Sequence, residues 1–375
     1  MAKEKKAKPV ATDTKSLMAI INKSHGDGSV MQGRGTMINV ETFTTGVASI
    51  DRAMGKGIPL GRIIEIYGPE SHGKTTTTLQ IVAACQNHYF ESKERKGMAA
   101  FIDAEHALDP EWASNIGVNV DELLISQPNS GEEAFDIMET MARSGLVDLI
   151  IVDSVAALIP KSELEGDIGD HHVGAQARLM SKGLRKIKGL ANSTKTTIIF
   201  INQIREKVGV MFGSPETTPG GRALKFYASI RGEVRKVGAI KDGDDVVGVR
   251  TKIKIIKNKV APPFVNAEFD ICVGNPKRPV YGIDKVSCLL DEAKDQKIVT
   301  TSGSWHAFKG DKFGNGVNQA VKSLMENDEL REQIQAELYN KINTRFESQA
   351  VNVDPEDSDY DAILDGESDS LVDED

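Results

Sequence analysis

Residues 68–75 combine two glycines, a lysine and a threonine at the spacing of a phosphate-binding loop, Gly-x-x-x-x-Gly-Lys-Thr. The glycines let the backbone wrap around a phosphate with its N–H groups pointing inward, the lysine reaches the β and γ oxygens, and the hydroxyl binds Mg²⁺. The strand-like residues 62–67 precede the loop, and a helix-like run to about Phe90 follows it. Because strand, loop and helix come in the required order, the sequence predicts a nucleoside triphosphate site and not a chance glycine-rich turn.

An acidic residue at the end of a second strand should lie on the metal side of this nucleotide. Residues 148–154 read Asp-Leu-Ile-Ile-Val-Asp-Ser, and a continuous apolar run of this kind is typical of a strand that is covered on both faces of a parallel sheet. Asp153 would then emerge at the carboxyl edge, where such sheets bind ligands. An aspartate that closes an apolar strand is more often only a strand terminus, but the phosphate loop upstream favours Asp153 as a Mg²⁺-side carboxylate.

Three long strings in the right order resemble a known family. They are Phe101-Ile102-Asp103-Ala104-Glu105-His106-Ala107-Leu108-Asp109-Pro110, the phosphate loop, and Phe200-Ile201-Asn202-Gln203-Ile204-Arg205 followed by Gly209-Val210-Met211-Phe212-Gly213. Together they closely resemble the bacterial RecA recombinase family, from about Met37 to about Phe269 and more weakly to about Lys341. The resemblance implies an α/β fold: a RecA-type P-loop ATPase core with a mainly parallel central sheet, an N-terminal helical arm and a small α+β C-terminal domain.

The resemblance also implies catalytic roles around ATP and Mg²⁺. Glu105 would activate the water that attacks the γ-phosphate, a task for which one carboxylate is chemically sufficient, and Gln203 would sense that phosphate. Lys257 and Lys259 match lysines that reach the γ-phosphate of a neighbouring subunit, although by composition alone their segment is an alternating strand with one solvated face. The catalytic residues implied are Glu105, Lys74, Gln203, Lys257 and Lys259.

Two further residues would contact the adenine. Asp109 matches a family residue at the base edge, and Trp112 stands where the family places a tyrosine against the ring, a position in which an indole can stack at least as well as a phenol. Without the resemblance, partial burial would be the simpler interpretation of Trp112. His72 departs from the family, which usually has a serine there. The cofactor-binding residues implied are Gly68, Pro69, Glu70, Ser71, His72, Gly73, Lys74, Thr75, Thr76, Asp109, Trp112 and Asp153, with Thr75 and Asp153 on the metal.

Two glycine-rich segments, residues 165–174 and 205–221, resemble the DNA-facing loops of the family. Val173 and Val208 fall where the family inserts apolar wedges between bases, which costs stacking but lengthens the strand. Arginines and backbone N–H groups would hold phosphates without reading sequence. The DNA-binding residues implied are Val173, Gly174, Arg178, Arg185, Arg205, Val208, Gly220, Gly221, Arg222, Lys252, Lys254 and Lys312.

A nucleotide site that a neighbour completes implies a repeating head-to-tail contact. Such a contact builds an open helical filament when its rotation does not close. The interface residues implied are Lys225 and Phe226, although a core aromatic is nearly as good an interpretation of Phe226. We expect four regions: an N-terminal arm for subunit packing at residues 1–36, the ATPase and DNA-binding core at 37–273, a small C-terminal domain at 274–346 and a disordered acidic tail at 347–375.

Charge is unevenly distributed along the 375 residues. The net charge is −9, but residues 351–375 hold eleven of the 55 acidic residues and none of the 46 lysines and arginines, so the rest of the chain is close to neutral. The tail fits either a solubility device or an internal competitor for basic DNA-binding surface. No apolar run is long enough for a membrane span, and the widely spaced Cys85, Cys272 and Cys288 indicate reduced thiols in a cytoplasmic protein.

The function implied is that of a DNA-dependent ATPase that polymerises on single-stranded DNA and exchanges strands with a homologous duplex in recombinational repair. Its partners would be both DNAs, further copies of itself, a LexA-type repressor and recombination mediator proteins, with no membrane. The alternative is a hexameric RecA-fold DNA helicase or translocase, which shares the loop, Asp153 and Glu105 but forms rings instead of filaments. A DNA-coating scaffold without enzymatic activity is the third hypothesis, and DNA-stimulated phosphate release would exclude it.

Overall fold

The computed structural model describes residues 11–26, 29–30, 40–167, 174–206, 216–276 and 278–351. The chain divides into two units, residues 1–40 and 41–375, and each is described by itself. In the first unit, helix α1 (Thr14–His25) begins with a capping box: the Asp13 carboxylate accepts a hydrogen bond from the Ser16 N–H (2.7 Å), and the Ser16 hydroxyl accepts one from the Asp13 N–H (3.1 Å). The predicted arm therefore contains a helix with a well-defined start.

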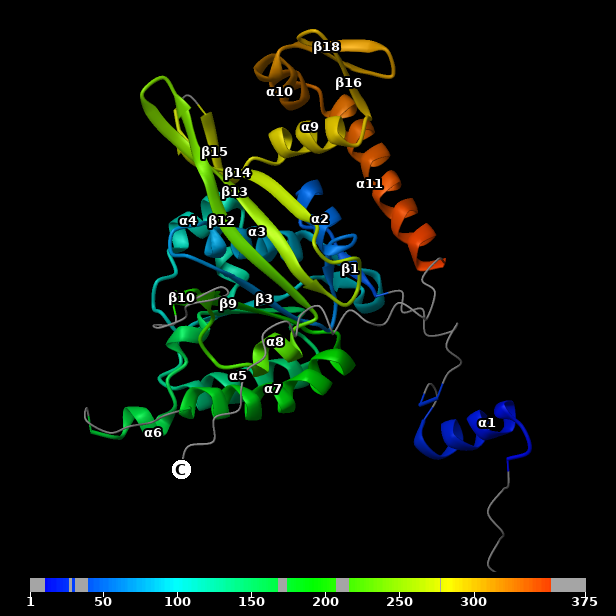
Figure 1. Cartoon of the computed structure of the whole chain (residues 1–375), viewed down its shortest axis with the longest axis vertical. Helices are drawn as coiled ribbons and strands as arrows, with labels where there is room; N and C mark the ends of the chain where they lie inside the picture. The colour runs from blue at the N-terminus through cyan, green and yellow to red at the C-terminus, as the bar shows by residue number, and fades with distance from the viewer. Residues whose placement is uncertain are drawn as a thin grey trace, which may run out of the picture. The chain divides into compact units, whose positions relative to one another are not determined.

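Within the described residues, a nine-stranded mixed sheet forms the centre of the second unit (Figure 1). Its strands, in spatial order, are β15 (Arg278–Ile283), β14 (Asn266–Asn275), β13 (Asp245–Asn258), β12 (Ile230–Asp242), β3 (Ile63–Gly68), β9 (Thr197–Gln203), β8 (Leu149–Asp153), β6 (Ala99–Asp103) and β7 (Leu124–Ser126). The pairings from β12 to β7 are parallel, and those from β15 to β12 are antiparallel. The predicted α/β core with a mainly parallel sheet is thus confirmed.

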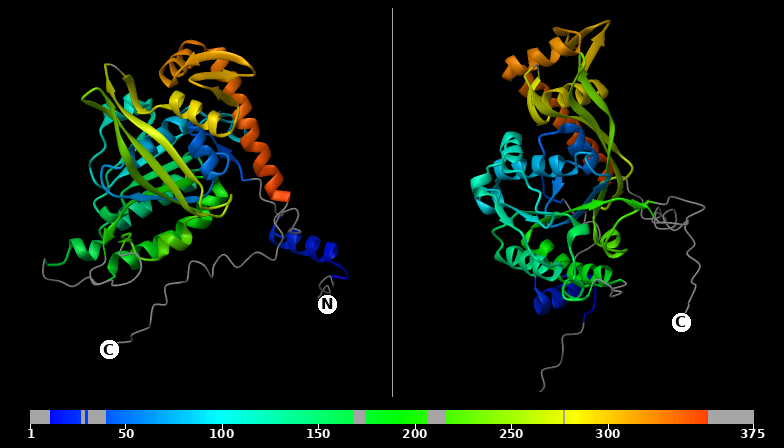
Figure 2. Two further views of the ribbon diagram at one scale, coloured as in Figure 1. Left: turned by 45° about the horizontal axis from the view of Figure 1, so that its top comes forward. Right: turned by 90° about the vertical axis from the view of Figure 1, so that its left-hand side faces the viewer.

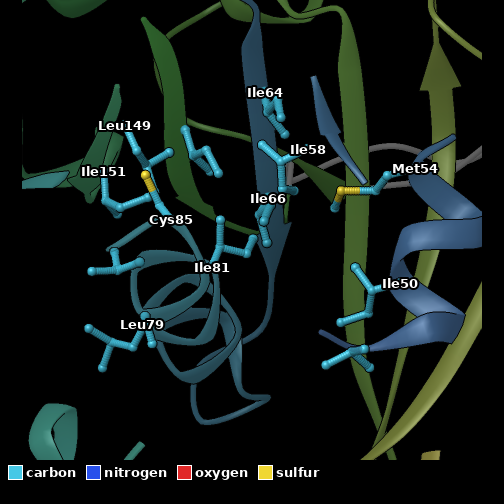
Figure 3. Packing of buried hydrophobic residues seen from close by; sticks show 14 of the residues in the cluster. Ile50, Met54, Ile58, Ile64, Ile66, Leu79, Ile81, Cys85, Leu149 and Ile151 are labelled. Atoms are coloured by element: carbon cyan, nitrogen blue, oxygen red, sulfur yellow. The ribbon is translucent and has the colours of Figure 1, made fainter. Parts of the chain in front are cut away.

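Helices cover both faces of this sheet, as the two views in Figure 2 show. On one face, α2 (Ala48–Met54), α3 (Lys74–Asn87) and α4 (Pro110–Ile116) share a buried cluster with Ile64 and Ile66 of β3. On the other, α5 (Gly131–Ser144), α7 (Ala175–Thr194) and α8 (Ala223–Tyr227) pack with Ile63 and Phe200. Neighbouring residues of a strand point to opposite faces, so a single buried strand feeds both layers. Figure 3 shows part of the first layer, where Ile81 of α3 lies next to Ile66 of β3.

Helix α3 ends earlier than the sequence predicts. We expected it to reach about Phe90, but it stops at Asn87, and β4 (Tyr89–Phe90) turns back through a 3-10 turn, η2 (Glu91–Lys93), to pair with β5 (Arg95–Lys96). The ring of Phe90 is buried edge-on against Phe43, with 6.0 Å between centroids. This tertiary contact favours the hairpin over another helical turn.

The C-terminal part of the second unit has its own buried cluster, which includes Leu290, Leu324 and Leu338. It comprises α9 (Lys285–Asp295), the three-stranded sheet β16 (Val299–Ser302), β17 (Trp305–Phe308) and β18 (Asp311–Asn315), and α10 (Val317–Glu326) and α11 (Asp328–Val351). Helix α11 continues past Phe346, where we expected this region to end, and the remainder of the predicted tail, residues 352–375, lies outside the described residues.

Two buried acids fasten this part to the core. Glu292 of α9 accepts a hydrogen bond from Arg52 (2.6 Å), and Asp51 of α2 accepts one from the Tyr339 hydroxyl of α11 (2.5 Å). Burial raises the pKa of Asp51, while its hydrogen bonds, first that from Thr44, act in the opposite direction. Both acids keep hydrogen-bond partners in the interior, as buried carboxylates require.

Short elements complete the described chain: β1 (Thr42–Phe43), β2 (Ile58–Pro59), η3 (Val120–Glu122), η4 (Val155–Ala157), α6 (Lys161–Leu164), β10 (Arg205–Glu206) and β11 (Glu216–Thr217). Cys85, Cys272 and Cys288 are buried and form no disulfide. Burial raises the pKa of each thiol, that of Cys272 to about 11. No helix among the described residues has the length and hydropathy to cross a bilayer.

Candidate functional site

The predicted phosphate loop connects the carboxyl end of β3 to the first turn of α3. A Cβ atom on Gly68 would lie 2.1 Å from the carbonyl oxygen of Val234 in β12, so only glycine lets these two strands approach. Gly73 caps the helix with φ of +90°, a left-handed conformation that glycine adopts without strain. The loop therefore delivers its backbone to the N-terminus of a 14-residue helix, which is a favourable place for an anion.

Lys74 is held across this loop. Its Nζ donates a hydrogen bond to the Pro69 carbonyl (2.7 Å), and the residue is 8% exposed. Burial lowers the pKa of Lys74, while nearby carboxylates, first that of Asp153, act in the opposite direction. A bound triphosphate would supply the negative charge that favours the ammonium form.

Thr75 and Asp153 meet as the metal prediction requires. The Thr75 hydroxyl donates to Asp153 Oδ2 (2.8 Å) at the end of β8. Burial raises the pKa of Asp153 to about 6, and the negative charge of Glu105 contributes to this rise. A hydroxyl and a carboxylate fit Mg²⁺, which commonly takes one or two protein oxygens and completes its shell with phosphates and water.

Glu105 lies beside this pair because β6 and β8 are neighbours in the sheet. The N–H groups of Ala104 and Glu105 both donate to the Asp153 carbonyl, at 2.8 and 3.2 Å. The Glu105 carboxylate accepts hydrogen bonds from the Ser154 hydroxyl and from Gln203 Nε2, the latter at 3.0 Å. The structure thus brings together Glu105, Gln203 and the metal-side pair at one edge of the sheet, where parallel strands end.

Sequence reasoning missed two residues that hold this cluster. Ser154, which follows Asp153 through a cis peptide bond, binds Glu105 directly. Asp103 is buried at the end of β6 and accepts hydrogen bonds from the N–H groups of Ala107 and Leu108 (3.0 and 3.3 Å). Asp103 therefore shapes the turn that carries Glu105. The acidic string Asp103-Ala104-Glu105 was the signal that could have revealed it.

The two adenine candidates lie at the start of α4. Asp109 caps this helix and accepts from the N–H groups of Glu111 (2.9 Å) and Trp112 (3.0 Å). Trp112 is half-buried; its indole N–H points to the Thr76 hydroxyl (3.4 Å), and its ring lies edge-on to Tyr281. The indole is therefore next to the first turn of α3, beside the loop that would hold the phosphates.

Stacking of Trp112 on a base can be measured by fluorescence, because Trp305 is the only other tryptophan of the chain. In a Trp305→Phe protein, we expect the emission of Trp112 to change when a non-hydrolysable ATP analogue saturates the site. A Trp112→Phe protein, which keeps Trp305, is the control and should show no change. An unchanged spectrum of the Trp305→Phe protein at saturating nucleotide would contradict stacking.

His72 lies near several positive charges. Its buried Nδ1 has no hydrogen-bond partner among the described residues. The pKa of His72 is lowered, first by burial and then by the positive charges of Lys74, Arg235 and Lys236. A bound triphosphate would favour the imidazolium and raise this pKa. Protons and nucleotide should then assist each other, so the added affinity is present at low pH and is lost as pH rises through the pKa of the bound state.

We therefore expect the ATP affinity of the wild type to rise between about pH 8 and pH 6 by up to about tenfold more than that of His72→Ser. The serine variant is the matched control, because it removes the imidazole but not the titration of ATP itself. Parallel affinity curves for the two proteins would show that the ring does not respond to the phosphates.

Lys257 lies away from the phosphate loop of its own chain. It pairs with Arg231 in the sheet, which in turn pairs with Glu65, three residues before Gly68. Its Nζ donates to the carbonyls of Lys225 (2.7 Å) and Phe226 (3.3 Å) in α8. Phe226 is 70% exposed, so the ring is not a core aromatic within this chain. Lys259 follows at the end of β13, where its N–H binds the Ser229 carbonyl (2.9 Å).

The DNA candidates fall into separate groups. Gly220 and Gly221 have positive φ and lie against Met180 and Ala177 of α7. The same helix, which Gly174 caps, exposes Arg178 and Arg185. Lys182, which sequence reasoning missed, lies between these arginines at helical spacing. Arg205 and Arg222 stand on β10 and at the start of α8.

The other three lysines belong to different elements. Lys252 and Lys254 share the outer face of β13, opposite the buried Ile253, and Lys312 of β18 lies over the Trp305 ring (5.4 Å to the centroid). The predicted wedges Val173 and Val208 lie outside the described residues. The DNA candidates of α7 therefore lie next to residues 219–222, whereas Lys252, Lys254 and Lys312 lie on β13 and β18.

Fold and site together define a P-loop ATPase with a mainly parallel core sheet. Comparisons with known proteins specify it further: residues 13–276 match the family model of the RecA N-terminal domain, and residues 287–343 match that of the RecA C-terminal domain. The chain is 53% identical over 320 residues to Protein RecA of Halalkalibacterium halodurans, covering 85% of this chain and 88% of that protein. It is 50% identical over 345 residues to Protein RecA of Saccharopolyspora erythraea, covering 92% and 96%.

The chain belongs to the bacterial RecA family. Its function is DNA-dependent ATP hydrolysis coupled to homologous pairing and strand exchange in recombination and repair. The comparisons give no support to the helicase alternative or to a scaffold without enzymatic activity.

Proposed function

We propose that Glu105 activates the attacking water and that Gln203 reports the γ-phosphate. The observation that carries this proposal is the 3.0 Å hydrogen bond from Gln203 Nε2 to Glu105 Oε1, beside Lys74 and the Thr75–Asp153 pair. Lys74 and the helix start would bind the phosphates, and Thr75 and Asp153 would hold Mg²⁺, which supplies charge neutralisation at the β and γ oxygens. Glu105 then acts through its charge and position, because phosphoryl transfer needs little covalent help.

We further propose that the site is shared between copies of the chain. Lys257, Lys259 and the exposed Phe226 of one copy would complete the nucleotide site of the next, in a head-to-tail filament. Single-stranded DNA would lie along α7 and residues 219–222, held by phosphate contacts of Arg178 and Arg185. The homologous duplex would approach the lysines of β13 and β18.

A strand-exchange assay tests this function directly. Circular single-stranded DNA and homologous linear duplex should yield nicked circles and a displaced strand only when ATP and Mg²⁺ are present. Electron microscopy of the same mixture should show helical filaments. Unwinding of a duplex without homologous single strand, with rings in the images, would instead support the translocase.

The setting is also part of the proposal. We infer a cytoplasmic protein, since its three cysteines are buried and unpaired, as in a reducing compartment. Family membership further suggests a LexA-type repressor and recombination mediator proteins as partners. Incubating a LexA-type repressor with the filament and following its cleavage tests the first of these.

A further inference from the structure

A buried glutamate lies in β3, the strand that leads into the phosphate loop. Glu65 is fully buried, and its two carboxylate oxygens accept hydrogen bonds from Arg231 Nε (2.5 Å) and Asn202 Nδ2 (3.0 Å). Arg231 comes from β12 and Asn202 from β9, the strands on either side of β3. Glu65 thus links three strands through side chains, and a carboxylate is retained in the interior only where it is paired in this way.

Asn202 uses its whole side-chain amide. Its Oδ1 accepts from the N–H of Gln203 (2.9 Å), while Nδ2 donates both to Glu65 and to the carbonyl of Pro219 (3.1 Å). The opposite orientation would place its oxygen against two acceptors and its NH₂ against a donor, so the neighbours fix the amide. The side chain of Asn202 therefore contacts β3, which leads into the phosphate loop, the backbone of Gln203, and Pro219, which precedes Gly220.

The two ends of this linkage reach the functional groups. At one end, Gln203 contacts Glu105 through its side chain. At the other, Pro219 precedes Gly220 and Gly221, which lie against α7, the helix that carries the DNA candidates Arg178 and Arg185. A pocket of ≈190 Å³, lined by Tyr67, Thr218 and Arg231 among others, borders the Arg231 end of these hydrogen bonds.

We propose that Asn202 and Glu65 are positioning residues that couple the nucleotide site to the DNA-facing segment. When the side chain of Gln203 binds a γ-phosphate, the backbone of Gln203 shifts and moves the hydrogen-bonded side chain of Asn202. The hydrogen bond from Asn202 to the Pro219 carbonyl then moves residues 219–221. Glu65 and Arg231 hold the amide in the orientation that this transmission requires. The inference rests on the roles proposed above for Gln203 and for residues 220–221.

The test is the factor by which nucleotide strengthens binding of single-stranded DNA. It is measured by fluorescence anisotropy of a labelled oligothymidylate, with and without a non-hydrolysable ATP analogue. In Asn202→Ala we expect this factor to fall by about tenfold or more, with the affinity for the analogue alone kept within about threefold. Glu65→Gln should lose less, because its amide oxygen can still accept from Asn202.

Asp51→Asn is the matched control. It alters another fully buried carboxylate of the core that has no contact with the linkage, so it should lower thermal stability without changing the factor. An unchanged factor in Asn202→Ala, or an equal loss in Asp51→Asn, would overturn the proposal. If Asn202→Ala does not fold, a wild-type factor in Glu65→Gln would overturn it equally. A wild type without any nucleotide effect on DNA affinity would instead refute the proposed roles of the site.

Discussion

Glu105→Gln should reduce the DNA-stimulated turnover of ATP by about 10²- to 10⁴-fold, the range that a positioned general base typically contributes. The amide has the size of the carboxylate and can still accept hydrogen bonds from Ser154 and Gln203 through its oxygen. The phosphate loop and the metal-side pair are untouched, and loss of the Glu105 charge removes one cause of the raised pKa of Asp153. Nucleotide and Mg²⁺ should therefore still bind.

Steady-state phosphate release and binding of a fluorescent ATP analogue, measured on the same preparation, separate these effects. The variant should bind the analogue within about twofold of the wild type and should form filaments on single-stranded DNA that persist for longer. Glu111→Gln, which changes an exposed carboxylate of α4 outside the residues assigned to the nucleotide, is the control for charge alone. Near wild-type turnover in Glu105→Gln would remove this residue from the mechanism.

Two inactive proteins should regain activity when they are mixed, if the site is shared between copies. Lys74→Ala should weaken ATP binding by about 10²-fold, since it removes the buried ammonium of the loop, and Lys257→Ala should bind ATP but turn it over slowly. In a mixed filament, a Lys257→Ala chain still has Lys74 in its phosphate loop, and a neighbouring Lys74→Ala chain still has Lys257. A site formed between these two chains therefore contains both lysines. With random mixing, about one contact in four is then intact.

An equimolar mixture should thus recover about a quarter of the wild-type turnover, far above the sum of the two variants. The measurement is phosphate release on single-stranded DNA at saturating ATP, after the variants are mixed before DNA is added. A mixture of each variant with wild type calibrates the exchange of subunits. Turnover of the mixture equal to the sum of its parts would place both lysines in a single chain's site.

Local patterns in the sequence predicted the phosphate loop and the buried strands around it. The glycine spacing and the apolar runs act over a few residues, so β3, α3 and β8 could be predicted with small errors in their ends. The end of α3 was the exception, because the position of Phe90 depends on its ring contact with Phe43, a residue that lies far away in the sequence.

The contacts within the site depended on the order of the strands, which local patterns do not contain. Glu105, Asp153 and Gln203 meet because β6, β8 and β9 are consecutive in the sheet, with β9 against β3. Family resemblance supplied their roles, but it named neither Ser154 nor Asp103. The role of Glu65 was the hardest to predict. A glutamate in an apolar strand can be recognised as a buried, paired carboxylate only when Arg231 is known to lie opposite it.

The three buried cysteines have a practical consequence for studying assembly. Burial disfavours the reactive thiolate at Cys85, Cys272 and Cys288, and thiolate character and access govern alkylation. The native cysteines should therefore react little with thiol-directed dyes. A single cysteine placed at an exposed position of α11, away from Phe226, would take the label, and energy transfer between labelled copies could follow subunit exchange without removal of any native cysteine.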